Sequence, residues 1–230
     1  MENKISNAAV PARASRRRKA PAPFRSHRPV APPQVSPTAN VAAVLSATRG
    51  VTVVGVGRTA RPPLAVPLAS APQACAWSDG GECLVVGDSA GALHFVDAAT
   101  GAALLSQPLA GGDASVEFCR IVVPRCVSSS SSGAPSVHGQ LLVLERSGRL
   151  HRFAGIEFGA IRDAAREDDR DALRRAKGRI TCALSTVGDE RSVPVDMQAT
   201  VRQHRVITFV AASGSGAFAG VTAWSLSCGA

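Results

Sequence analysis

The chain has 230 residues, with 45% hydrophobic and 4% aromatic side chains, no tyrosine and a formal net charge of +9. A chain of this length can bury one sizeable core, which must be built from Val, Leu, Ile and Ala. Because no apolar run approaches the ~20 residues that span a bilayer, and no apolar stretch marks a secretory signal, we expect a protein without a membrane partner.

The positive charge is concentrated at the start of the chain. Residues 1–40 carry eight Lys or Arg, one Glu and seven of the 15 prolines, whereas residues 41–230 carry 18 basic and 16 acidic side chains. A segment of this kind cannot bury enough apolar surface to offset the entropy of ordering it, so we predict a disordered tail over residues 1–40.

One basic run in this tail is a candidate signal. It comprises Arg16, Arg17, Arg18 and Lys19. Such a run is typical of a nuclear-import signal or a phosphate-binding arm. An equal alternative is a solvated tail that no specific partner recognises. We expect nucleic acid to bind only through this tail, because a nucleic-acid-binding fold usually carries its basic face within the folded part.

From residue 41 onward, repeated β-hairpins are predicted. Leu84–Val96 (LVVGDSAGALHFV) and Leu141–Phe153 (LLVLERSGRLHRF) share an apolar triplet, four turn-like residues, Gly, one residue and Leu-His. Weaker copies are Phe209–Val221 and the segment AVLSATRGVTVV around Gly50. Repetition at a few tens of residues indicates an array of similar supersecondary units.

The first strong copy lies within the outline of a β-propeller blade. Residues 74–106 read as four short apolar strands joined by three tight turns. The repeated glycines are Gly50, Gly91, Gly148 and Gly216, and the first pair has the ~40-residue spacing of a propeller blade. We therefore predict an all-β fold, a partial β-propeller of about four WD-repeat-like blades over residues 41–230. Because propellers close with up to ~8 blades, the chain looks like part of a larger one.

One segment breaks the β pattern. Residues 156–177 place apolar side chains such as Ile161, Ala165 and Leu173 at helical spacing, with charges on the opposite face. This pattern predicts one amphipathic helix that ends at Gly178. We expect it to be an insertion between blades, laid across the rim or a face of the propeller.

A nucleophile motif occurs in the first hairpin. Gly87–Gly91 (GDSAG) matches G-x-S-x-G, with Asp163 or Asp189 and His204 as formal partners of Ser89. A nucleophile elbow requires a helix after the Ser, whereas ALHFV alternates like a strand, and the second hairpin keeps the same turn frame. We therefore predict that the chain is not an enzyme and has no catalytic residues; a Ser hydrolase using Ser89 is the less favoured alternative.

Possible metal ligands have structural interpretations. His94 and His151 occupy the same repeat position, but equivalent residues of neighbouring blades need not lie within ~2 Å of one ion. The acidic run Glu167–Asp169 is most simply solvated charge beside several Arg side chains. The six cysteines lack C-x-x-C or zinc-finger spacing, which indicates reduced thiols in a cytosolic or nuclear setting. We predict no metal, no cofactor and no small-molecule substrate.

The order of these motifs resembles a known family. The segments ECLVVGDSAGALHFVDAATGAALL, then LLVLERSGRLHRF with its charged helix and ITCALST, then VITFVAASGSGAFAGVTAW are similar to the N-terminal region of the Rod (Rough deal, kinetochore-associated) family. The resemblance covers roughly residues 75–225; the basic tail and the polyserine loop depart from it. In that family, an N-terminal propeller precedes a long helical solenoid.

The resemblance implies a non-enzymatic scaffold for protein–protein interaction. Rod is the large subunit of the Rod–Zwilch–Zeste-white complex, which supports the spindle checkpoint at outer kinetochores and recruits Spindly and dynein–dynactin. The implied partners are Zwilch, the Zeste-white subunit and Spindly with dynein. The implied location is the kinetochore, with the nucleus and cytoplasm. An unrelated WD-like adaptor remains the alternative.

Overall fold

The structure is a computed structural model in which the described residues are 31–46, 48, 50–57, 62–109, 116–124, 139–187, 192–202, 205–214 and 220–227. The basic run at residues 16–19 and most of the expected tail lie outside these ranges, so their disorder remains a prediction. The first strand begins at Gln34, which lies inside the range 1–40 expected to be tail.

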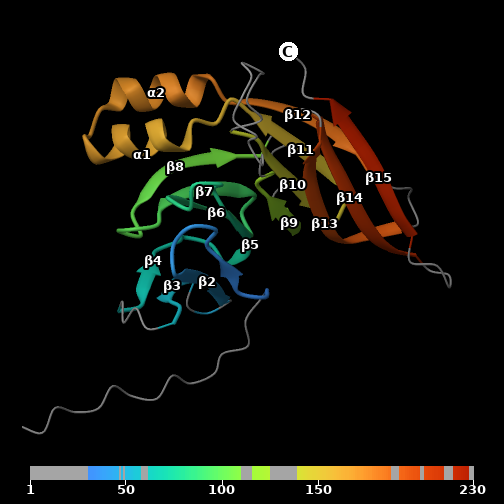
Figure 1. Ribbon diagram of the computed structural model, residues 1–230, viewed down its shortest axis with the longest axis horizontal. Coiled ribbons are helices and arrows are strands. Elements are labelled where there is room, and N and C mark those ends of the chain that lie inside the picture. The colour runs from blue at the N-terminus through green and yellow to red at the C-terminus, as the bar shows by residue number, and fades with distance from the viewer. Residues whose placement is uncertain are drawn as a thin grey trace, which may run out of the picture.

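Four antiparallel sheets follow one another along the chain (Figure 1). Sheet A has the strands β1 Gln34–Val35, β2 Val41–Ser46, β3 Gly50–Gly55 and β4 Leu64–Val66. Sheet B has β5 Pro72–Trp77, β6 Cys83–Asp88, β7 Ala92–Asp97 and β8 Ala103–Pro108. Sheet C has β9 Phe118–Val122, β10 Leu141–Glu145, β11 Arg149–Ala154 and β12 Thr181–Thr186. Sheet D has β13 Ser192–Arg202, β14 Arg205–Gly214 and β15 Gly220–Ser227.

The two matched segments are antiparallel ribbons of the same form, as predicted. In β6–β7, Gly87 pairs with Leu93, and in β10–β11, Leu144 pairs with Leu150. The turn glycine has φ +77° at Gly91 and +84° at Gly148, a conformation that glycine adopts without a Cβ clash. The weaker copies also fall on paired strands, β2–β3 and β14–β15.

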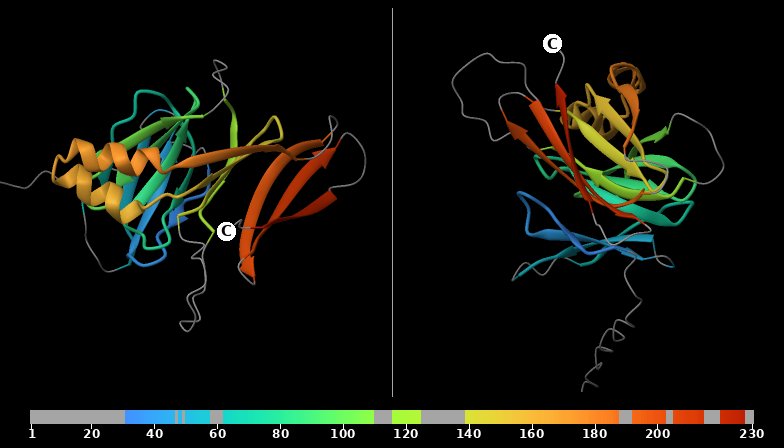
Figure 2. Two further views of the ribbon diagram at one scale, coloured as in Figure 1. Left: turned by 90° about the horizontal axis from the view of Figure 1, so that it is seen from above. Right: turned by 90° about the vertical axis from the view of Figure 1, so that its right-hand side faces the viewer.

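The sheets are arranged as in a β-propeller. The first strands of successive sheets contact one another, β1 with β5, β5 with β9, and β9 with β13. They therefore line a common axis, and the remaining strands of each sheet lie progressively farther out. Figure 2 shows sheet D at the opposite end of the molecule from the two helices. The architecture is the predicted partial β-propeller.

The apolar runs of the central strands are explained by burial on both sides. Leu84 and Val86 of β6 belong to a cluster shared with sheet A, whereas Val85 belongs to one shared with sheet C. A strand that is covered on both faces carries continuous apolar residues instead of alternating with polar ones. A third cluster, with Leu144 and Val210, joins sheets C and D.

Two helices replace the single helix predicted over residues 156–177. They are α1 Phe158–Arg166 and α2 Arg170–Gly178, joined by a turn in which Asp168 has φ +53°. Asp169 begins α2 as its N-cap, since its carboxylate accepts the Ala172 N–H at 2.9 Å. Because the chain reverses direction between the helices, the apolar faces of both helices pack against the same hydrophobic cluster. A single straight helix over these residues would extend beyond sheet C, and part of its apolar face would not be buried.

The position of the helices also differs from the prediction. They lie within sheet C, between its third strand β11 and its fourth strand β12, and not between blades. α1 contacts β8 of the preceding sheet, so the helical hairpin bridges sheets B and C at the outer end of the blade (Figure 1). Among the described residues, neither helix is long and apolar enough to cross a membrane.

Candidate interaction surface

The first matched hairpin contains a buried acid–histidine pair. His94 Nε2 lies 2.8 Å from Asp88 Oδ2, and His94 Nδ1 lies 2.9 Å from Ser106 Oγ. The other carboxylate oxygen of Asp88 accepts the Ala90 and Ala92 N–H groups, each at 3.0 Å. One buried carboxylate thus closes the turn and holds the imidazole, which joins the second, third and fourth strands of the sheet.

The second hairpin repeats this arrangement. Glu145 takes the place of Asp88, and its Oε1 is hydrogen-bonded to His151 Nε2. Its Oε2 accepts the Ser147 hydroxyl at 2.7 Å. Each pair faces the preceding sheet, because Val86, the partner of His94, packs toward sheet A and Val143, the partner of His151, packs toward sheet B. Both histidines therefore lie on the face of their sheet that packs against the preceding blade, and each is hydrogen-bonded to the carboxylate of its own hairpin.

The Ser89 motif does not form a nucleophile elbow. Strand β7 follows the turn, where an elbow requires a helix. The imidazole of the same sheet, His94, is bonded to Asp88 and Ser106. Asp163, one formal triad partner, lies on α1 and pairs with Arg162 at 2.7 Å. Asp189 and His204, the other formal partners, lie outside the described residues.

The acidic run between the helices has local partners. Asp169 caps α2, and Asp168 lies 4.0 Å from Arg170 with both side chains highly exposed. Within the described ranges, no group of three or more His, Cys, Asp or Glu side chains is placed to hold a metal ion. The geometry of this turn is that of a helix cap, not of a cation site.

The described thiols are free and poorly suited to nucleophilic chemistry. Burial raises the pKa of Cys75 and of Cys83 to about 12. Burial also raises the pKa of Cys119 and of Cys182 above the ordinary value. Because the thiolate is the reactive form, none of these four residues is activated at neutral pH.

A bidentate ion pair between Arg166 of α1 and Asp97 of β7 attaches the helical hairpin to sheet B. Arg166 Nε donates to Asp97 Oδ2 at 2.7 Å and its terminal nitrogen donates to Oδ1 at 3.0 Å. The Asp97 side chain is 2% exposed and that of Arg166 is 46% exposed. Burial alone would raise the pKa of Asp97, but hydrogen bonds from Arg166 and the Ala99 N–H outweigh it and hold the pKa below its usual range.

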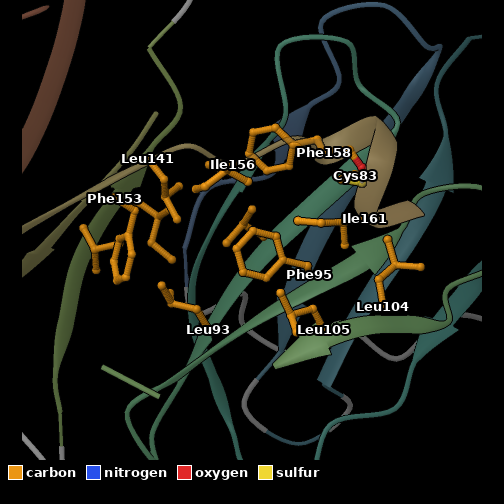
Figure 3. Packing of buried hydrophobic residues seen from close by; sticks show 14 of the residues in the cluster. Cys83, Leu93, Phe95, Leu104, Leu105, Leu141, Phe153, Ile156, Phe158 and Ile161 are labelled. Atoms are coloured by element: carbon orange, nitrogen blue, oxygen red, sulfur yellow. Dashed lines mark hydrogen bonds between the residues drawn. The ribbon is translucent and has the colours of Figure 1, made fainter. Parts of the chain in front are cut away.

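Apolar packing completes this attachment (Figure 3). The rings of Phe95 and Phe158 lie 6.0 Å apart and tilted by 41°. Ile161 is fully buried in the same cluster as Leu104, and the Cys83 thiol donates to the Phe158 carbonyl at 3.7 Å. The helical hairpin is therefore packed firmly against the propeller through both polar and apolar contacts.

Two neighbouring surface hollows lie along the inner strands of the sheets. The first hollow has a volume of about 620 Å³ and is lined from residues 31–32 and from β5, β9, the β10–β11 turn and β13. Its charges come from Arg120, Arg146, Glu117 and Asp196. Arg120 Nε lies 3.4 Å from Asp196, and Arg146 Nε lies 3.8 Å from Glu117. The Arg146–Glu117 pair is more than 60% exposed, so it can exchange its partners for those of a bound protein.

The second hollow continues along the same strands, and several apolar side chains line it. Its volume is about 570 Å³, and it shares Arg120 with the first. Val35, which is 59% exposed, and Val122 line it, and Trp77 forms part of its floor. Trp77 is fixed because its indole N–H donates to the Gln34 carbonyl at 2.8 Å. The two hollows together are termed the axial groove, and the charged side chains of the first hollow lie along the same strands as the apolar side chains of the second.

Sequence reasoning found the hairpins but missed both the axial groove and the ion pair of the helices. Arg120 and Asp196 are far apart in the chain, as are Asp97 and Arg166. No local pattern links such residues, since they meet only when the sheets stack. The one available signal for the ion pair was an aspartate at the end of an apolar strand, before a turn.

The sequence of residues 64–228 matches the protein-family model described as KNTC1, N-terminal. The matched range starts at β4 and extends through sheets B, C and D. No curated protein matches the sequence significantly.

The solved structures of U3-55K and Sqt1 share the fold. U3-55K aligns with a TM-score of 0.52 and 14% identity, covering 87% of this chain and 50% of that chain. Chaetomium thermophilum Sqt1 bound to the N-terminus of the ribosomal protein L10 aligns with a TM-score of 0.50 and 20% identity, covering 76% and 39%. The Myceliophteria thermophila Cps50 (Swd1) β-propeller domain aligns with a TM-score of 0.47 and 15% identity, covering 83% and 57%. The chain thus spans less than two thirds of each of these proteins.

Proposed function

The chain belongs to the KNTC1 N-terminal family, and from this premise we propose that it is a non-enzymatic scaffold that binds other proteins at the kinetochore during mitosis. KNTC1 is the human homologue of Rod, so the resemblance seen in the sequence is confirmed. The observation that carries the proposal is the family match over residues 64–228, because it covers sheets B, C and D.

The contrast between buried carboxylates, which are paired within the fold, and exposed charged side chains supports a binding role. The buried carboxylates of Asp88, Glu145 and Asp97 are all engaged by partners within the fold. The exposed charges, by contrast, border the axial groove and cover the helical hairpin. Such a molecule can present exposed side chains to other proteins, because binding residues are commonly carried by loops that a folded scaffold holds in place.

The Ser hydrolase alternative has a direct test. A fluorophosphonate probe labels activated serines, and we expect it to leave the folded chain unlabelled. Labelling that disappears in Ser89→Ala would overturn the non-enzymatic proposal. A matched Ser147→Ala variant, in the equivalent turn of the second hairpin, controls for nonspecific labelling.

The proposed partners are those of the family's complex, Zwilch and the Zeste-white subunit, with Spindly and dynein acting through the assembly. We expect the purified chain to capture Zwilch, and Arg146→Glu in the axial groove to weaken capture more than the matched Arg174→Glu on α2. Arg146 and Arg174 are both well exposed, with side-chain exposures of 64% and 81%. Undiminished capture by both variants would remove the axial groove from the interface.

Localisation separates the kinetochore proposal from an unrelated adaptor. We expect the tagged full chain to be enriched at kinetochores in prometaphase and to spread through nucleus and cytoplasm in interphase. Enrichment at another structure throughout the cell cycle would favour an unrelated WD-like adaptor. Loss of kinetochore signal when Zwilch is depleted would tie the location to the complex.

The basic run has its own proposal, namely nuclear import or phosphate binding. Replacing Arg16, Arg17, Arg18 and Lys19 together by Ala should shift the interphase protein toward the cytoplasm if the run is an import signal. If it binds nucleic acid, the same change should abolish a salt-sensitive affinity for RNA or DNA. A variant that matches the original chain in both assays would identify the run as a solvated tail.

A further inference from the structure

The outer edges of the first three sheets are protected to very different degrees. The outer strand of sheet A, β4, has three residues between Pro62–Pro63 and Pro67. The outer strand of sheet B, β8, ends at Pro108 and contacts α1. Short strands, prolines and covering helices are the usual means by which proteins prevent further strands from pairing with a sheet edge.

The outer strand of sheet C has none of these features. β12 comprises six residues, Thr181–Thr186, without a charge or a proline, and it is the last strand in the order of its sheet. Every one of its residues is exposed, including Leu184 at 55%. Among the described residues, no strand pairs with its outer edge. The edge therefore presents backbone donors and acceptors, beside an exposed apolar side chain, to another strand.

Most charges around this edge are positive, and the exposed Glu157 beside it is already paired with Arg179 at 2.7 Å. Arg149, on the neighbouring strand β11, is exposed and pairs by register with Thr186. The last turn of α2, which leads directly into β12, carries the exposed Arg175 and Lys177. These three cations have no ionic partner among the described side chains, and neither β11 nor β12 contains an acidic residue. An incoming segment therefore meets a positive field along the edge.

We propose that the β12 edge binds an extended, acidic segment of a partner protein, which adds to sheet C as a fifth strand. Backbone hydrogen bonds to β12 would supply affinity, and carboxylates of the segment would pair with the cations of β11 and α2. The inference rests on the proposed scaffold function only in assuming a protein partner. It does not depend on the kinetochore location or on the axial groove.

Synthetic peptides provide the test on the full chain. The probe is a fluorescent decapeptide of alternating Val and Glu, and its counterpart carries Lys in place of Glu. We expect saturable binding of the Glu peptide by fluorescence anisotropy and binding of the Lys peptide that is at least about tenfold weaker. Equal binding of both peptides would overturn the acidic specificity.

Backbone methylation tests strand addition itself. N-methylation of every second residue removes the N–H groups on one edge of an extended peptide and leaves the other edge intact. We expect methylation at one set of alternate positions to abolish binding of the Glu peptide and methylation at the other set to preserve it. Equal binding of both methylated peptides would overturn strand addition.

A charge reversal locates the site without endangering the fold. Lys177→Glu, beside β12, should weaken binding of the Glu peptide about fivefold, whereas Arg170→Glu, at the far end of the same helix, should change it less than twofold. Equal weakening by both variants would place the peptide elsewhere. A concentration-dependent dimer that the Glu peptide dissociates would identify a second copy of the chain as the occupant and overturn the proposal of a partner segment.

These outcomes are distinct from those of the kinetochore test. Failed peptide binding with intact kinetochore enrichment would remove only the strand-addition site. Intact peptide binding without kinetochore enrichment would remove only the proposed location.

Discussion

Replacing Arg166 by Met should weaken the attachment of the helical hairpin to sheet B. Met keeps much of the apolar stem but removes the two hydrogen bonds, of 2.7 and 3.0 Å, that neutralise the buried Asp97 carboxylate. Breaking a fully buried ion pair costs about 3–5 kcal/mol, whereas breaking an exposed pair costs about 0–1 kcal/mol. Asp97 is buried but Arg166 is half-exposed, so we expect the free energy of unfolding to fall by about 2 kcal/mol.

The same variant should alter the acid sensitivity of the protein. The pKa of Asp97 lies below its usual range in the folded state, so this group stabilises the fold above its unfolded pKa of about 3.9. That stabilisation is lost as the pH falls through the lower, folded-state pKa. Without Arg166, only the hydrogen bonds from Ala99 and Thr100 oppose the effect of burial, so the pKa of Asp97 should be higher in the variant and the carboxylate should be protonated at a higher pH. The stability difference between the two proteins should therefore be largest near neutral pH and shrink below about pH 4.

Urea unfolding followed by tryptophan fluorescence measures this difference, and thermal unfolding should show a Tm lower by about 4–8 °C. The matched control is Arg174→Met, which removes an Arg–Asp pair whose side chains are 81% and 73% exposed. It should change stability by less than about 0.5 kcal/mol. Equal stabilities of the two variants, or a difference that does not change with pH, would refute the reasoning.

Three further predictions concern the core, the turns and the thiols. Ile161→Ala, at a fully buried site on α1, should cost about 2–5 kcal/mol in the free energy of unfolding, and an unchanged urea midpoint would contradict the burial. Gly148→Ala should destabilise more than Gly57→Ala by thermal unfolding, because both have positive φ but only at Gly148 would a Cβ meet a backbone oxygen at 2.8 Å; equal losses would show that φ alone matters. The thiols of Cys75 and Cys83, with pKa values raised to about 12, should resist a disulfide reagent at pH 8 until urea is added, and peptide mapping of labelled sites checks this.

The repeat was readable in the sequence because it depends on short-range chemistry. Tight turns need residues such as Gly91 and Gly148, and central strands need apolar runs such as those before them, so both hairpins could be placed from local signals. The histidines at the matched position are each hydrogen-bonded to a carboxylate of their own hairpin. The amphipathic segment was located correctly, although its break at Asp168 and Asp169 depends on how much apolar stripe one blade can cover.

The tertiary structure alone decided which residues meet between blades. Arg120 reaches Asp196, Asp97 reaches Arg166, and β12 is left exposed while β8 contacts α1. The physical reason is that hairpin formation is governed by neighbours along the chain, whereas grooves and free edges depend on the stacking of whole sheets. The sequence by itself thus determined the blades and their family, and only the packed molecule determined the surfaces with which it can bind a partner.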